Sequence, residues 1–159
     1  MKRVLAASVV TLMASGCATV VKEPSQPLRI ETLTMEGEII GGAECSVTND
    51  RGSVTMRSGE SMNVRRSSKD LDITCTAPGQ PTASARAVSR ANGGMWGNAV
   101  VGGGIGAVID HKKGNGYTYP TWLQLVFGKA LSFDRRSEKA GAPAPATEVT
   151  QKASAAVRD

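Results

Sequence analysis

Alternating apolar and polar positions dominate residues 28–90 of this chain. Residues 43–48 put an Ala, a Cys and a Val at every second position, which is the pattern of a half-buried strand. Residues 49–52 read Asn-Asp-Arg-Gly, and residues 53–57 resume the alternation. Because Asn and Asp bond their own backbone and Gly adopts positive φ, we expect a hairpin over 43–57.

The same pattern predicts further strands at 28–35, 61–66 and 71–75, with turn chemistry between them. Residues 82–90 alternate small and polar side chains, and we expect a weakly packed edge strand there. About six short strands at regular spacing are typical of a small antiparallel sandwich or barrel. The sequence therefore predicts a mainly β domain.

After residue 90 the pattern changes. Residues 95–109 are Gly-rich and apolar, with no charge until Asp110. Residues 121–127 predict a closing strand, and 129–138 predict a polar exit from the domain. The end of the chain is rich in Ala and Pro without an apolar period, so we expect disorder over 134–159.

The N-terminus has the organisation of a secretory signal. Lys2 and Arg3 come first, an apolar run over 4–13 follows, and small residues lead to Cys17. The segment Ala14-Ser15-Gly16-Cys17 resembles the lipobox of bacterial lipoproteins, although Ala14 stands where that family prefers Leu. The resemblance implies cleavage before Cys17 and a diacylglycerol on its sulfur, so that Cys17 carries acyl chains, including palmitate.

These features predict four regions: a signal peptide at 1–16, a polar tether at 17–27, a β-sandwich domain at 28–133 that includes the Gly-rich segment 93–110, and the tail at 134–159. Ala18 follows the lipid-bearing cysteine. In enteric-type bacteria an Asp at that position retains lipoproteins in the inner membrane, so by resemblance the lipid anchor is expected in the outer membrane, facing the periplasm.

Composition adds two constraints. The chain of 159 residues has two each of Trp, Tyr and Phe but 18 Gly, so its core contains few large side chains. Losing Lys2 and Arg3 with the signal lowers the formal charge from +5 to +3. A net charge this small, in a chain without a long run of Lys and Arg, argues against a nucleic-acid partner.

Cysteine usage fits an exported protein. Of the three cysteines, Cys45 and Cys75 remain once Cys17 is lipidated. In the alternating pattern both residues lie at core-facing positions of their predicted strands. This is compatible with a disulfide between them or with two buried free thiols. We expect the disulfide in an oxidising compartment, where closing a loop of about 30 residues contributes roughly 3–4 kcal/mol.

A second resemblance covers residues 42–127. The matching positions are Cys45, Asn49-Asp50-x-Gly52, Arg65-Arg66-Ser67, Asp70-Leu71, Cys75, Gly79, Trp96-Gly97-Asn98, Gly102-Gly103-Gly104-Ile105-Gly106, Asp110 and Gly116-Tyr117-x-Tyr119-Pro120. They are similar to a family of uncharacterised Gram-negative lipoproteins whose domain resembles the PEGA-type β-sandwich, a truncated immunoglobulin-like fold. The resemblance implies a fold and a location, and no activity.

Three interpretations of residues 95–109 stay open. The segment can pack on the sandwich, where glycines permit close backbone approach. It can enter the membrane with Trp96 at the interface, or form close helix contacts with a partner or a second copy. As a nucleotide loop it lacks the β-α-β context. Candidate membrane or partner contacts are Trp96, Gly102, Gly103, Gly104, Gly106, Tyr117 and Tyr119.

The aromatic residues at 117–122 allow two interpretations, a small binding face or a satellite core that seats the Gly-rich segment. Catalytic chemistry has little support. His111 has no ligand-spaced partners for a metal, and Asp70 and Asp72 predict a solvated strand face. Arg65, Arg66 and Lys69 form the densest basic group, which suits a phosphate or carboxylate partner.

We therefore expect a non-enzymatic, lipid-anchored outer-membrane lipoprotein that acts as a structural or interaction module, with no cofactor, metal or small-molecule substrate. The expected partners are membrane lipid, through Cys17, and an envelope protein or a second copy. The alternative is a membrane-inserting or oligomerising component of an envelope transport or assembly complex, acting through 95–109.

Overall fold

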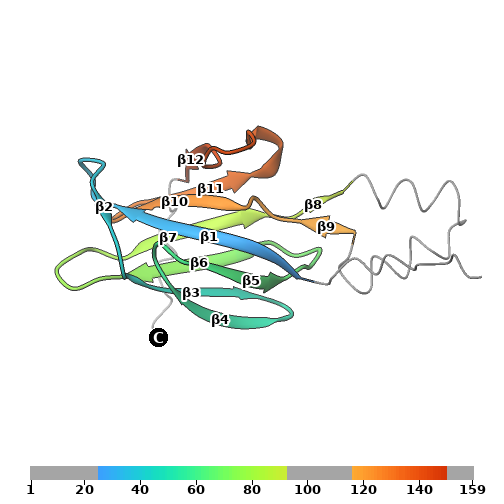
Figure 1. Cartoon of the computed structure of the whole chain (residues 1–159), viewed down its shortest axis with the longest axis horizontal. Helices are drawn as coiled ribbons and strands as arrows, with labels where there is room; N and C mark the ends of the chain where they lie inside the picture. The colour runs from blue at the N-terminus through green and yellow to red at the C-terminus, as the bar shows by residue number, and fades with distance from the viewer. Residues whose placement is uncertain (1–24, 93–115, 150–159) are drawn as a thin grey trace, which may run out of the picture.

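The computed structural model of this chain describes residues 25–92 and 116–149 (Figure 1). Its strands are β1 (Ser25–Leu33), β2 (Ile39–Ile40), β3 (Glu44–Asn49), β4 (Gly52–Arg57), β5 (Ser61–Arg65), β6 (Leu71–Thr76), β7 (Ala83–Val88), β8 (Arg90–Ala91), β9 (Tyr117–Thr118), β10 (Trp122–Val126), β11 (Ala130–Asp134) and β12 (Ala146–Glu148). A short 3-10 helix, η2 (Arg135–Ser137), follows β11.

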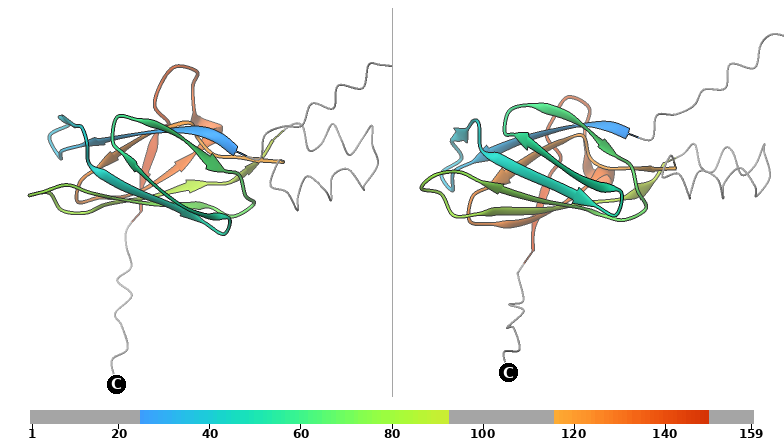
Figure 2. Two further views of the ribbon diagram at one scale, coloured as in Figure 1. Left: turned by 60° about the horizontal axis from the view of Figure 1, so that its bottom comes forward. Right: turned by 90° about the horizontal axis from the view of Figure 1, so that it is seen from below.

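The strands form two layers that pack face to face (Figures 1 and 2). In the first sheet β1 is central, with β10 on one side and β5 and β2 on the other. The second sheet has the order β12-β11-β7-β6-β3-β4, and β8 pairs with β9 as a separate ladder. The predicted mainly β sandwich is therefore confirmed.

Both sheets are mixed, whereas the pattern predicted an antiparallel fold. β10 runs parallel to β1, and β11 runs parallel to β7. Parallel neighbours need a long connection between them. Here Arg29 pairs with Trp122 and Ser84 pairs with Ala130, so the partners lie far apart along the chain and local turn signals indicate neither pairing.

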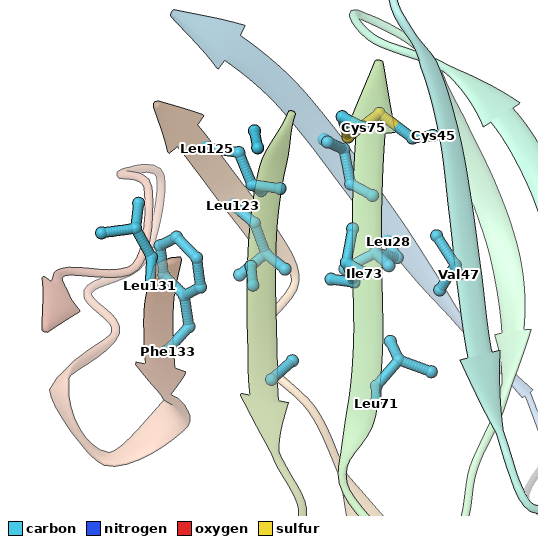
Figure 3. Close-up of a cluster of buried hydrophobic side chains, with 14 of the residues drawn as sticks. Leu28, Cys45, Val47, Leu71, Ile73, Cys75, Leu123, Leu125, Leu131 and Phe133 are labelled. Atoms are coloured by element: carbon cyan, nitrogen blue, oxygen red, sulfur yellow. A yellow bond between two sulfur atoms is a disulfide. The ribbon is translucent and has the colours of Figure 1, made fainter. Parts of the chain in front are cut away.

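The core lies between the two sheets and is built from the predicted alternation (Figure 3). In β6, Leu71, Ile73 and Cys75 are buried while the residues between them are exposed. The opposite layer contributes Leu28 and Ile30 from β1 and several side chains from β10 and its flanks. The fully buried large side chains are Tyr119, Phe127, Phe133, Leu28, Ile30, Leu71, Ile73, Leu123, Leu125, Val47 and Val64.

The predicted disulfide is confirmed. Cys45 of β3 and Cys75 of β6 are direct neighbours in the register, with Cα atoms 4.1 Å apart and both residues fully buried (Figure 3). The bridge therefore joins adjacent strands of one sheet. In immunoglobulin domains, by contrast, the disulfide connects the two sheets.

The predicted edge strand at 82–90 is wrong in its position. β7 lies in the middle of its sheet, between β6 and β11. Ala83, Ala85 and Ala87 face the core with at most 7% of their surface exposed. Small side chains predicted weak packing, but a strand with a neighbour on each side is held by two ladders of backbone hydrogen bonds.

The domain also extends beyond its predicted limits of 28 and 133. β1 starts at Ser25, and Gln26 is buried, so the end of the expected tether belongs to the sheet. The expected polar exit contains β11, with Leu131 and Phe133 buried. β12 then pairs with β11, inside the region expected to be disordered. Flanking charges concealed the apolar alternation of 130–134.

Candidate functional site

One end of the sandwich collects loops from distant parts of the chain. We call it the basic end and define it by residues 49–52, 65–70, 89–92, 116–121 and 134–138. Ser25, where the described domain starts, pairs with Arg65 in the sheet register at this end. The amide of Asn92 donates to the carbonyl of Gly116 at 2.7 Å. The N-terminal segment and the 93–115 segment therefore both join the domain here (Figures 1 and 2).

The basic end is the more positive end of the described domain. Its seven cationic residues are Arg51, Arg65, Arg66, Lys69, Arg90, Arg135 and Arg136, and its four acidic residues are Asp50, Asp70, Asp134 and Glu138. At the opposite end, which we call the far end, the loops 34–43, 58–60, 77–82 and 127–129 contain Glu36, Glu38, Glu60 and Lys129. The domain therefore has a charge asymmetry along its long axis.

Tyr119 anchors the loops of the basic end. Its side chain is fully buried, its hydroxyl donates to the carbonyl of Lys69 at 2.7 Å, and it accepts from Nδ2 of Asn49 at 3.1 Å. The pKa of Tyr119 is raised, mainly because burial disfavours the phenolate. The backbone of Tyr119 is held in turn by both amide atoms of the buried Gln26 side chain.

A second group of hydrogen bonds ties the same loops together. The Ser67 hydroxyl bonds the carboxylate of Asp50 and accepts from the amide of Lys69. The Ser89 hydroxyl donates to the carbonyl of Ser67, and the Ser89 amide donates to Asp70. The basic loops are therefore fixed to one another by side chains of their own.

Several cations of the basic end lack an acidic partner. Arg65, Lys69 and Arg136 are exposed and form no ion pair within the described ranges. Arg66 is half-buried, and its Nε has no hydrogen-bond partner. The pKa of Arg66 is lowered, first by desolvation and then by the neighbouring charge of Arg135. Opposite charge from outside the domain would relieve this repulsion.

Other charges at this end are neutralised internally. Asp134 accepts hydrogen bonds from the Arg90 guanidinium and from the backbone amide of Arg136. The Arg90 bond, followed by the Arg136 amide, lowers the pKa of Asp134 to about 2. Arg135 lies 4.0 Å from Glu138, and Arg51 lies 3.6 Å from Asp50. These contacts leave the surplus positive charge on Arg65, Arg66, Lys69 and Arg136.

A cavity of about 410 Å³ opens between β4 and β5 beside the basic end. Val47, Val64 and Leu71 contribute apolar surface, and Arg51 and Arg65 are among the polar residues that line it. No sequence pattern indicates this cavity, because its walls come from both sheets. It places apolar side chains next to two arginines.

The aromatic cluster predicted at 117–122 is divided by the structure. Tyr119 belongs to the main core, so it is neither an exposed binding face nor part of a satellite core. Tyr117 is half-buried in β9. Trp122 lies on the outer face of the first sheet, where the Arg29 guanidinium sits 4.8 Å from its ring centroid. The three aromatic residues therefore do not form one cluster. They lie in the core, in the β8–β9 ladder and on the outer face of the first sheet.

Beside Trp122, Arg29 pairs with Glu31, which is buried although it points out of the sheet. Gln124 donates to Glu31 at 2.9 Å, and this bond, with that of Arg29, lowers the pKa of Glu31. The cluster satisfies its own charges and stabilises the pairing of β1 with β10.

The two carboxylates singled out by the sequence do not act as a pair. Asp70 accepts from the Ser89 amide at 3.0 Å, whereas Asp72 pairs with Arg86 at 3.3 Å on an exposed strand face. Among residues 25–92 and 116–149 no cluster of three metal-ligating side chains occurs. Cys17, Trp96, Gly102, Gly103, Gly104, Gly106 and His111 lie outside the described residues.

Sequence reasoning identified Arg65, Arg66 and Lys69 as a basic group but missed Arg51 and Arg136. Arg51 lies in a hairpin turn, and Arg136 lies in η2, in a segment interpreted as an exit. Their positions relative to residues 65–69 depend on the packing of the two sheets, which no local pattern encodes.

No protein-family model matches the chain, and neither a curated protein nor a solved structure matches it. Within the two described ranges, no helix is long and apolar enough to cross a membrane. The site is therefore interpreted from its own geometry and charge.

Proposed function

We propose that this protein is a lipid-anchored outer-membrane lipoprotein, held through acyl chains on Cys17 and facing the periplasm. The observation that carries the proposal is the buried Cys45–Cys75 disulfide. Such bonds persist in oxidising compartments, which an exported chain reaches. The N-terminal organisation and the lipobox-like segment Ala14–Cys17 supply the route to that compartment.

The folded domain acts as a non-enzymatic interaction module in this proposal. Support comes from the basic end, where hydrogen bonds from Tyr119, Ser67 and Ser89 fix the loops that display the charges. A surface whose charged side chains stand on a fixed backbone loses little conformational freedom when it binds. The resemblance to Gram-negative lipoproteins agrees with the proposed location and implies no activity.

One observation favours a second function, in which residues 95–109 insert into the membrane or oligomerise as part of an envelope complex. The β8–β9 ladder holds the two connections to the 93–115 segment side by side at the basic end. Ser25, and with it the connection to Cys17, lies at the same end. A lipid anchor would therefore keep this segment near the bilayer.

The test compares wild type with Cys17→Ser by metabolic labelling with radioactive palmitate, membrane fractionation and alkaline extraction. We expect label and membrane association in wild type, and an unlabelled, soluble variant. The double variant Cys45→Ser/Cys75→Ser is the matched control, because it keeps Cys17 and should keep the label.

Unlabelled wild-type protein would contradict the lipid anchor. A Cys17→Ser protein that stays in the membrane and resists alkaline extraction would favour the second function instead. Free thiols at Cys45 and Cys75 in protein isolated from the envelope would contradict the disulfide, and with it the inference of an oxidising compartment.

A further inference from the structure

We propose that the basic end docks on the anionic phosphate headgroups of the membrane that carries the lipid anchor. The inference rests on the proposed function and adds an orientation to it. The domain stands with Arg65, Lys69 and Arg136 against the bilayer surface and with the far end pointing away from it.

The N-terminal segment joins the folded domain at the basic end. Ser25 starts β1 at the basic end, only eight positions after Cys17. Eight residues span at most about 29 Å when fully extended. The nine residues of β1 cover roughly 30 Å from the basic end toward the far end. The tether therefore meets the domain at the basic end, and it reaches the level of the far end only when it is fully extended along the domain.

The loops at the two ends of the domain differ in net charge. The loops that surround Ser25 hold seven Lys and Arg residues against four Asp and Glu, whereas the far-end loops hold three Glu residues and one Lys. Charges interact through salt water over only about a Debye length, roughly 8–10 Å. When the domain stands on its tethered end, only the charges of the basic end approach within that distance, so their sign decides whether this orientation is attractive. The sign is positive, and bacterial phospholipid surfaces containing phosphatidylglycerol are negative.

Three cations of the basic end are exposed on elements with fixed positions. Arg65 is the last residue of β5, Lys69 lies in a loop pinned by Tyr119 and Ser67, and Arg136 lies in η2. The three side chains are exposed and have no ion pair in the part of the chain that the structure describes. Docking therefore breaks no internal pair.

Arg66 and Arg135 repel each other at the basic end, which also favours an anionic partner there. Arg66 is half-buried and its Nε has no hydrogen-bond partner, and its pKa is lowered first by desolvation and then by the positive charge of Arg135, which itself lies 4.0 Å from Glu138. Phosphate oxygens accept hydrogen bonds from guanidinium groups in a favourable bidentate geometry. Headgroups at the basic end would supply the missing negative charge.

The experiment measures vesicle partitioning of the mature chain carrying Cys17→Ser, so that no acyl chain contributes. Vesicles of phosphatidylcholine alone are compared with vesicles of equal parts phosphatidylcholine and phosphatidylglycerol, at low and high salt. We expect partitioning into the anionic vesicles only, and loss of this partitioning at high salt.

The decisive variant is Arg65→Gln/Lys69→Gln/Arg136→Gln, which leaves the half-buried Arg66 in place. Each cation near an anionic surface contributes about fivefold to the partition coefficient, so the triple variant should bind about 100-fold more weakly. The matched control is Arg57→Gln/Arg86→Gln/Lys129→Gln, which removes the same charge elsewhere on the domain. It should bind within about threefold of the parent, since Arg57 and Lys129 lie at or next to the far end and Arg86 already pairs with Asp72. Urea unfolding confirms that both variants fold.

Equal losses in the two triple variants would overturn the orientation, because binding would then follow net charge alone. Salt-insensitive partitioning into neutral vesicles would also overturn it and would favour insertion of the 95–109 segment. A parent that binds neither vesicle overturns the docking while the palmitate result on Cys17 still stands. Absence of palmitate overturns the anchor whatever the vesicles show.

Discussion

The two ends of the sandwich are stabilised by different kinds of interaction. Near the far end the Cys45–Cys75 bridge joins β3 to β6 covalently. The basic end has no cross-link among the described residues and is held by hydrogen bonds from Tyr119, Ser67 and Ser89. The far end exposes Met35 and Ile39, with 68% and 66% of their surface accessible, whereas the basic end exposes arginine and lysine.

The covalent cross-link of this small domain and its exposed surplus charge therefore lie at opposite ends. A disulfide acts mainly by restricting the unfolded chain, so its position matters little to the surface chemistry. Hydrogen bonds from buried side chains fix particular loop conformations, because each donor and acceptor has a defined direction. The end that displays uncompensated charge is also the end where loop positions are specified residue by residue.

The largest expected effect comes from removing the bridge. Cys45→Ala/Cys75→Ala should lower the free energy of unfolding by about 3–4 kcal/mol, because the unfolded chain regains the freedom of a 30-residue loop. Urea unfolding of oxidised wild type and of the variant measures the difference. At concentrations where the variant is folded, its partitioning into anionic vesicles should match that of the parent. A loss of partitioning in a folded variant would show that the two ends are coupled and would break the comparison.

A smaller effect is expected from Tyr119→Phe, which keeps the ring in the core. The change removes the hydroxyl that donates to the Lys69 carbonyl and accepts from Asn49. Leaving a buried polar group without its partner costs about 1–3 kcal/mol. Urea unfolding measures this cost, and hydrogen exchange should become faster at residues 66–70.

The control for Tyr119→Phe is Thr32→Val near the far end. Thr32 donates from its hydroxyl to the carbonyl of Ile40 at 2.6 Å. This variant should accelerate exchange around residues 39–40 and leave 66–70 unchanged. If Tyr119→Phe accelerated exchange equally at both ends, the hydroxyl would have a global role instead of a local one.

The smallest expected effect is a pH dependence centred on Asp134. Its pKa is lowered to about 2 in the folded protein from an ordinary value of 3.8. A lowered pKa in the folded state stabilises the protein above the ordinary value, and this contribution disappears as the pH falls toward 2. The difference in unfolding free energy between wild type and Asp134→Asn should therefore shrink between pH 3.8 and about 2. A difference that is constant over this interval would show that Arg90 and Asp134 do not interact in solution.

The sequence by itself determined the local elements of this protein. Strict alternation placed Cys45 and Cys75 on the core side of their strands, and Asn-Asp-Arg-Gly at 49–52 defined the hairpin between β3 and β4. These features depend only on neighbouring residues, because side chains alternate across a strand and turn residues bond their own backbone. The signal-like and lipobox-like patterns of residues 1–17 likewise consist of adjacent residues.

Only the tertiary structure decided which distant strands pair and which charges meet. β7 became a central strand because β11 adds to it in parallel, and the end of the chain joined the sheet as β12. Arg136 came to lie at the same end as Arg65 and Lys69 for the same reason. Register and neighbours across a sheet arise from packing between segments far apart in sequence, and an alternating pattern indicates only which face of a strand is buried.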